Sequence, residues 1–199
     1  MAKNYATRDK MIFVKENDDS FVMFLPPDMA SVREFRKELK NSLEVHNFCG
    51  EDILQVELAA DEALTNSVTA NVKNHSEETI ICRWRIDNYK LTLYIVDYGK
   101  GFKYEPEKCS GACMDLPKSL RGYIDSIMRH QSDTKEHLPF SGVRQLHKNM
   151  GKGLHIVHTF MDTVKILYHT EESISDNPEG SEIMGSIMQL DFDAKKHSS

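Results

Sequence analysis

The chain has 199 residues and a net charge of −6, and 40% of its residues are hydrophobic, which fits one globular domain with at most one large insertion. Its acidic balance argues against a general nucleic-acid binder, which usually carries a basic surplus. No apolar run approaches the about 18–20 residues of a membrane span, and the polar N-terminus lacks the apolar core of a secretory signal. We therefore expect a cytoplasmic protein that acts without a membrane.

The first half of the chain predicts two hairpins separated by two helices. Apolar residues recur at spacings of three and four in the first helix, at Val32, Phe35, Leu39 and Leu43, as an amphipathic helix requires. The strand segments are rich in β-branched and aromatic residues. We expect strands at 11–14 and 20–25, helices at 29–46 and 51–74, and strands at 79–86 and 91–97.

The second half begins with a long segment, 98–150, that has little sustained periodicity, and a loop of this length is usually functional or disordered. We expect one short helix within it, at 116–130. A helix at 151–164 and strands at 164–169 and 182–192 follow. Paired strands alternating with helices indicate an α+β fold, in which helices pack on one face of a mixed, mostly antiparallel sheet.

The four cysteines do not predict a disulfide framework, because cytoplasmic thiols stay reduced. Cys109 and Cys113 form a C-x3-C pair with three histidines downstream. These spacings match no common zinc signature, so we expect unligated thiols.

The stretch DEALTN (61–66) places Glu62 and Asn66 one turn apart on the same helix face. An amide oxygen can ligate Mg²⁺, and a carboxylate can accept a proton from a nucleophile. By itself, a solvated helix face is the simpler explanation of this pair. Asp61 lies about 100° further round the helix, and we interpret it as a surface or lid-facing charge.

Two glycine motifs follow, and each has an ordinary structural explanation as well. In VDYGKGF, Asp97 ends a strand before Gly99 and Gly101. Its carboxylate can accept a hydrogen bond from an exocyclic amine, or the motif can be an ordinary turn at the end of the strand. In NMGKGLHIV, Gly151, Lys152 and Gly153 open a helix, and free N–H groups at such an end attract phosphate.

Together, and in this order, the three stretches resemble the N, G1 and G2 boxes of the GHKL ATPases. LAADEALTNSV and GKGLHIVHTFMDTVKI are most similar to bacterial anti-sigma factor serine kinases of the RsbW and SpoIIAB type. The resemblance covers about residues 10–102 and 149–193. It implies a two-layer α/β sandwich, the Bergerat ATP-binding fold, over the single domain 1–199, with an enlarged ATP lid at about 103–150.

The resemblance also implies roles for individual residues. Glu62 falls at the general base that activates a serine hydroxyl, Asn66 at the Mg²⁺ ligand, and Asp97 at the acceptor of the adenine amino group. The glycines would shape the loops around ATP, with Lys152 and Leu154 in the third box. The segment GSIMQL (185–190) implies that Ser186 lies near Asp97 and adenine.

The implied partners are a sigma factor and a STAS-type anti-sigma-factor antagonist, with a tendency to form homodimers. Two features depart from the family. Ala70 stands where the family often has histidine, and the loop at 103–150 is longer, with six basic and three acidic residues between 118 and 150. This loop suits a lid over phosphates, a docking surface for an acidic partner or a disordered segment.

These departures keep alternatives to a serine kinase open. A nucleotide-gated binding protein without kinase activity is the first, and a scaffold without ATP is another. A histidine kinase module needs an accepting histidine on a dimerising helix pair, and the helix at 29–46 offers only His46, at its end.

Overall fold

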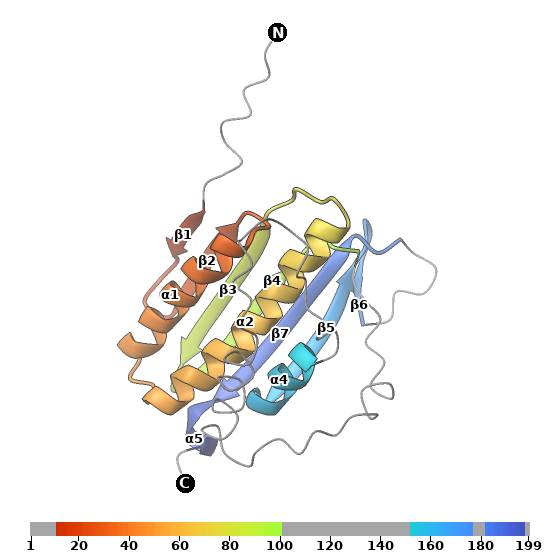
Figure 1. The fold of residues 1–199 in the computed structure, drawn as a ribbon. Coiled ribbons are helices and arrows are strands. Elements are labelled where there is room, and N and C mark those ends of the chain that lie inside the picture. Colours follow the sequence, from red (N-terminus) through yellow and green to blue (C-terminus); the bar gives the residue numbers. More distant parts are fainter. Residues whose placement is uncertain (1–10, 101–151, 177–181, 198–199) are drawn as a thin grey trace, which may run out of the picture. The chain divides into compact units, whose positions relative to one another are not determined.

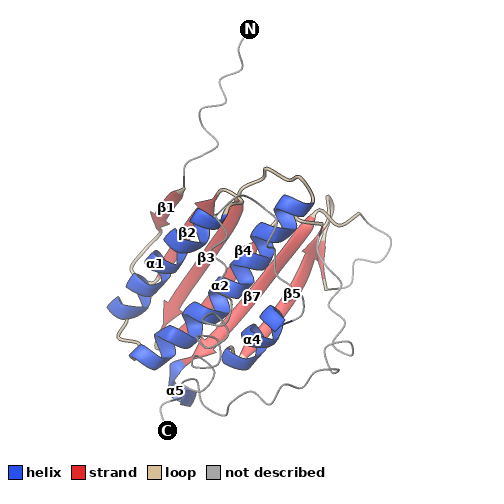
Figure 2. Ribbon diagram, in the orientation of Figure 1, coloured by secondary structure: helices blue, strands red, loops and turns tan. Residues whose placement is uncertain are grey.

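Seven strands form one open antiparallel sheet within the described part of the chain, which in this computed structural model is 11–100, 152–176 and 182–197. The spatial order of the strands is β1-β2-β3-β4-β7-β5-β6. Three helices lie side by side on one face (Figure 1), and Figure 2 shows the resulting helix and strand layers. The expected α+β, two-layer fold is thereby confirmed.

The strands are β1 (Ile12–Lys15), β2 (Ser20–Leu25), β3 (Ile80–Asp87), β4 (Lys90–Val96), β5 (Thr163–His169), β6 (Ile174–Ser175) and β7 (Gly185–Asp193). The helices are α1 (Met29–Val45), α2 (Gly50–Lys73), α4 (Lys152–Phe160) and α5 (Ala194–His197). All described residues belong to one unit, Met1–Phe102 with Lys152–Ser199. The insertion at 103–150, its short helix and its two cysteines lie outside the described residues, so those predictions stay predictions.

The sheet is more uniform than expected, because each described strand pair is antiparallel and none is parallel. The connection from β2 to β3 runs through two helices, α1 and α2, and so returns the chain to the end of the sheet that it left. The next strand must then run antiparallel to its neighbour. β7 inserts between β4 and β5, which separates the two strands that run in the same direction.

The core lies between the sheet and the helices. In β3, residues alternate between buried and more exposed positions, as in a sheet with one covered face. Trp84 is fully buried, donates to Ser42 Oγ at 2.8 Å and contacts Phe35 edge to face. Ser42 and Phe35 belong to α1, so the Trp84 side chain links that helix to the sheet.

Several boundaries differ from the predicted ones. α4 ends at Phe160 rather than at 164, because the next turn is anchored to β7: Asp162 N–H donates to Asp191 O at 2.9 Å, and Asp162 Oδ2 accepts from Asp193 N–H at 2.7 Å. β7 begins at Gly185 rather than at 182. Two short elements, β6 and α5, were not predicted.

Candidate functional site

Asp97 lies at the end of β4, directed toward α2, and only 3% of it is exposed. Its Oδ2 accepts hydrogen bonds from Ser186 Oγ at 2.7 Å and from Ser67 Oγ at 3.0 Å. Its Oδ1 accepts hydrogen bonds from the N–H groups of Gly99 at 3.0 Å and of Ser186 at 3.3 Å. Four donors from three parts of the chain therefore hold this buried carboxylate in one orientation.

The turn after Asp97 is fastened to the C-terminal end of α2. Asn71 is fully buried, accepts from Tyr98 N–H at 2.9 Å and donates to Glu78 O at 3.0 Å. Asn74 donates through Nδ2 to Gly99 O. A β-carbon at Gly99 would overlap Ala70, within 2.6 Å of its carbonyl carbon, so the glycine allows the turn to lie directly on α2.

Glu62 and Asn66 sit further toward the N-terminal end of α2, opposite the start of α4. Both are partly exposed. A β-carbon at Gly153 would lie 2.6 Å from Glu62 Oε2 and 3.5 Å from Asn66 Nδ2. The absence of a side chain at Gly153 is what lets the first turn of α4 approach both polar groups. Backbone N–H groups at a helix start attract anions, so the arrangement combines an acid, an amide and an anion-binding helix end.

Asp61, next to Glu62, is not a simple surface charge. It forms an ion pair with Arg36 of α1, and its other carboxylate oxygen is buried without a hydrogen-bond partner. Burial raises the pKa of Asp61, and the Arg36 guanidinium opposes that shift without cancelling it. Burial also raises the pKa of Glu57, one turn earlier.

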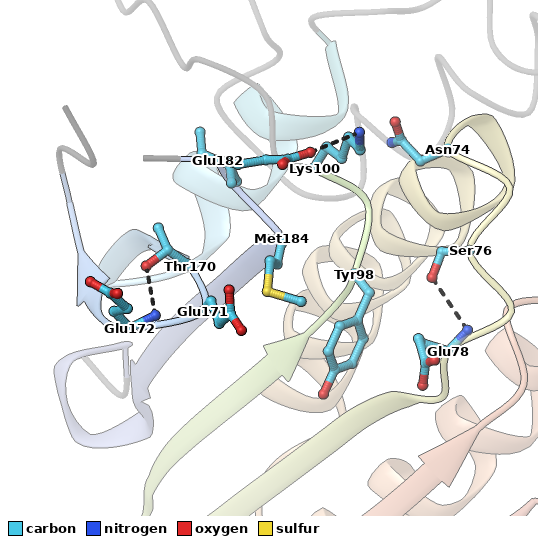
Figure 3. A pocket seen from close by; sticks show the side chains of 11 residues that line it. Asn74, Ser76, Glu78, Tyr98, Lys100, Thr170, Glu171, Glu172, Glu182 and Met184 are labelled. Atoms are coloured by element: carbon cyan, nitrogen blue, oxygen red, sulfur yellow. Dashed lines mark hydrogen bonds and ion pairs between the residues drawn. The ribbon is translucent and has the colours of Figure 1, made fainter. Parts of the chain in front are cut away.

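An open groove of about 680 Å³ lies on the other side of the turn after Asp97. Side chains alternate along a strand, so Tyr98 faces this groove whereas Asp97 faces the helices. Figure 3 shows Tyr98 and Met184 in its wall and Lys100 beside Glu182, with which it pairs at 3.3 Å. The groove also contains Glu78, Glu171 and Glu172, which makes it acidic.

The structure brings together six of the ten residues singled out from the sequence, in two clusters along α2: Asp97, Gly99 and Ser186 in one, and Glu62, Asn66 and Gly153 in the other. Leu154 is buried, with 9% exposed, and its side chain packs in the core. Lys152 opens α4, but its side chain is outside the description, as are Gly101 and Gly151.

Sequence reasoning missed three residues of the site. Ser67 follows Asn66 directly and holds Asp97, while Asn71 holds the turn. The ring of His169 on β5 is 2.7 Å from Asp97 O through Nε2. Ser67 and Asn71 come one and five residues after Asn66 on the same helix. Their closeness to a predicted site residue could have identified them from the sequence. His169 comes from a distant strand and gave none.

The donor set fits a nucleotide with its metal. The cluster at Asp97 offers a fixed acceptor for an amine, and the start of α4 offers N–H groups to phosphate. Among the described residues, no group of three or more His, Cys, Asp or Glu side chains could hold a metal ion. The residue that would hold a Mg²⁺ ion here is Asn66, through its amide oxygen and together with phosphate oxygens, since Mg²⁺ binds nucleotides with few protein ligands.

Comparison with known families gives a match that covers most of the chain. Residues 25–175 match the family described as the histidine kinase-like ATPase domain, a range that contains Glu62, Asn66 and Asp97. No curated protein matches the chain. Within the described ranges, no helix has both the length and the apolar character needed to span a membrane.

Proposed function

The chain belongs to the histidine kinase-like ATPase domain family and is thus an ATP-binding domain, and on that premise we propose that it is an anti-sigma factor with serine-protein kinase activity. Its proposed substrate is a STAS-type anti-sigma-factor antagonist, and its second partner is a sigma factor. The supporting observation is the pairing of Glu62 and Asn66 opposite Gly153 at the start of α4.

In this proposal each polar residue has one task. The Asp97 carboxylate accepts a hydrogen bond from the amino group of adenine, and hydrogen bonds from Ser67 and Ser186 keep that carboxylate in place. Asn66 ligates Mg²⁺, and the N–H groups at the start of α4 bind phosphate. Bound ATP supplies the phosphoryl group. Glu62 accepts the proton of the substrate serine while the serine oxygen takes the γ-phosphoryl group and ADP leaves.

A nucleotide-gated regulator without kinase activity is the second candidate. Ala70, where the resembling kinases often have histidine, lies against Gly99. Alanine has no polar group, so any phosphate contact from that position is lost, while the hydrogen bonds that hold Asp97 are preserved.

A histidine kinase module is disfavoured by the surroundings of His46. Its Nδ1 lies 2.6 Å from Ser42 O, and its Nε2 lies 3.3 Å from Asp19 Oδ1. Both ring nitrogens therefore have partners in the fold, and the ring is in edge contact with Phe21. A phosphoryl acceptor needs one nitrogen accessible to ATP.

Two measurements are needed, one to test the ATP site and one to separate these candidates. In calorimetric titration with ATP and Mg²⁺, Asp97→Asn should weaken binding by about 10–100-fold, because it replaces a charged acceptor. Asp191→Asn, which alters a part-buried carboxylate on β7 away from the site, should bind like the wild type. Equal affinity of Asp97→Asn and wild type would refute the site.

Transfer of labelled phosphate from ATP to STAS-type proteins of the same genome tests the kinase. Glu62→Ala should lower the transfer rate by about 10²–10⁴-fold, whereas the neighbouring Asp61→Asn should retain most of it. Tight ATP binding by the wild type without transfer to any such protein would select the nucleotide-gated regulator instead.

A further inference from the structure

The ring of His169 on β5 reaches the backbone of Asp97 across a whole strand. β7 lies between β4 and β5 in the sheet (Figure 1), so the backbones of β4 and β5 are about 10 Å apart. The His169 ring spans this gap, and its Nε2 lies 2.7 Å from Asp97 O. A side chain can cross β7 in this way only where β7 leaves space for it.

Gly185 leaves that space because it has no side chain. It is the residue of β7 directly opposite His169, and a β-carbon on it would overlap both His169 Nε2 and Asp97 O. Side chains alternate between the two faces of a strand. The next residue, Ser186, bonds to the Asp97 carboxylate on the helix side, so Gly185 faces the opposite side. His169 therefore approaches Asp97 from behind the ATP site.

The backbone hydrogen bonds between Asp97 and Ser186 show what the histidine replaces. The ladder of β4 and β7 aligns Val96 with Ile187, so Asp97 and Ser186 form the next pair. Asp97 N–H donates to Ser186 O at 2.9 Å. In a regular antiparallel sheet, such a pair also exchanges the reverse bond, from Ser186 N–H to Asp97 O. Here Ser186 N–H donates to Asp97 Oδ1 instead, at 3.3 Å.

The backbone carbonyl and the carboxylate of Asp97 thus compete for one N–H group. The carbonyl accepts a hydrogen bond from His169, and the carboxylate receives the Ser186 N–H group that the carbonyl would otherwise bind. Buried backbone carbonyls are seldom left without a partner. Without the histidine, we expect Ser186 N–H to return to Asp97 O, so that Oδ1 loses one of its two donors.

We propose that His169 is a positioning residue for adenine recognition. By bonding to Asp97 O, it leaves Ser186 N–H for the carboxylate, and it thereby sets the direction from which that carboxylate accepts the amino group of adenine. Direction matters because a hydrogen bond weakens steeply as it departs from a straight line. The inference rests on the proposed role of Asp97, and it adds the residue that orients the acceptor from the far side of the sheet.

The contact also specifies which ring nitrogen of His169 carries the proton. A carbonyl oxygen can only accept, so Nε2 must donate, and the neutral ring must be the Nε2–H tautomer. Tyr98 contacts this ring edge to face, with the ring centroids 5.1 Å apart. Long-range ¹H–¹⁵N correlation spectra of the wild type, recorded where the imidazole is neutral, should show a proton on Nε2. A proton on Nδ1 would overturn the proposal.

Calorimetric titration with two nucleotides tests the positioning role. ATP and the triphosphate of purine riboside differ only in the amino group that Asp97 is proposed to recognise. His169→Leu removes the donor, so it should weaken ATP binding by about tenfold but change the affinity for the analogue by less than about twofold. His169→Gln keeps an N–H group within reach of Asp97 O and should restore most of the preference for ATP.

Lys165→Leu is the matched control for His169→Leu. Lys165 is exposed on β5, four residues before His169, and therefore on the same face of the strand. The control should bind both nucleotides like the wild type, and thermal unfolding shows whether each variant is folded. If His169→Leu does not fold, His169→Asn replaces it, because the shorter amide cannot reach Asp97 O. It should lose the preference that His169→Gln keeps.

The outcomes separate a failure of this proposal from a failure of the ATP site. A preference for ATP that Asp97→Asn loses but His169→Leu keeps would overturn the role of His169 alone. Equal weakening of both nucleotides by His169→Leu would overturn it too, since a purely structural residue has that effect. A preference that survives in Asp97→Asn would refute adenine recognition by Asp97, and the positioning role with it.

Discussion

The two polar clusters of the site differ in how firmly the fold holds them. Asp97 is almost completely buried and receives four hydrogen bonds, whereas Glu62 and Asn66 are partly exposed and lie opposite a glycine. The first cluster joins β4, β7 and α2, so changing it should alter stability and binding together. The second lies between two helices near solvent, so changing it should alter chemistry alone.

Gly185→Ala is expected to have the largest effect, on the Asp97 side. A β-carbon there would overlap Asp97 O and lie 2.7 Å from the Asp97 carbonyl carbon, and it would also overlap the His169 ring. Gly185 is the first residue of β7, which pairs with β4 on one side and β5 on the other, so its backbone has little room to shift. We expect a loss of about 3–5 kcal/mol of folding free energy and a loss of ATP binding. Urea unfolding and calorimetry measure the two effects.

Gly50→Ala is the control for that substitution. Nothing lies within 4 Å of a β-carbon at Gly50, at the start of α2, and alanine favours helix over glycine by up to about 1 kcal/mol. The variant should be as stable as the wild type or slightly more so. A Gly185→Ala protein that binds ATP with unchanged stability would show that the Asp97 cluster is less rigid than its hydrogen bonds indicate.

Gly153→Ala should separate chemistry from folding on the Glu62 side. The new β-carbon would lie 2.6 Å from Glu62 Oε2, but a carboxylate at the end of a flexible side chain can rotate away. Stability should therefore hold or rise, while phosphoryl transfer falls by about 10–100-fold because the base is misplaced. ATP affinity should change much less.

A double-mutant cycle tests whether that loss acts through Glu62. In a Glu62→Ala background, adding Gly153→Ala should cost no further activity if the methyl group acts only by displacing the carboxylate. An additional loss of similar size would mean that Gly153 contributes through the helix end itself, for example by its contact with phosphate.

Local patterns were enough to predict most of the fold. The apolar spacing in α1 predicted its buried face, and Phe35, Leu39 and Leu43 are all 0% exposed. The sequence predicted a turn at 87–90, and Asn88 and Tyr89 both have positive φ there, as the two-residue turn between β3 and β4 requires. Such features depend on residues close together in the sequence, where periodicity and turn chemistry act.

Contacts between distant segments could not be predicted in the same way. Ser67 reaches Asp97 across 30 residues, and His169 reaches its carbonyl across 72. Neither contact follows from periodicity, because each depends on the strand register and on how α2 rests on the sheet. The ion pair of Asp61 with Arg36 is similar, since it depends on the packing of two helices whose exposed faces look alike in sequence.

Asp61→Asn should change the free energy of unfolding the least of these substitutions, and the direction of the change follows from the pKa of Asp61. Burial raises the pKa of Asp61 above its ordinary 3.8, so the folded protein keeps this proton to higher pH than the unfolded chain. The stability gained from that proton is complete below 3.8 and is lost as the pH rises through the raised pKa. Asparagine cannot titrate, so the free energy of unfolding of the variant should rise relative to that of the wild type from pH 4 to neutrality, by less than about 1 kcal/mol.

Urea unfolding across this pH range measures the difference. A variant whose relative stability falls instead would show that the ion pair with Arg36 outweighs the cost of burying the charge. Asp61 would then be one of the residues that hold α1 against α2, the helix that carries Glu62.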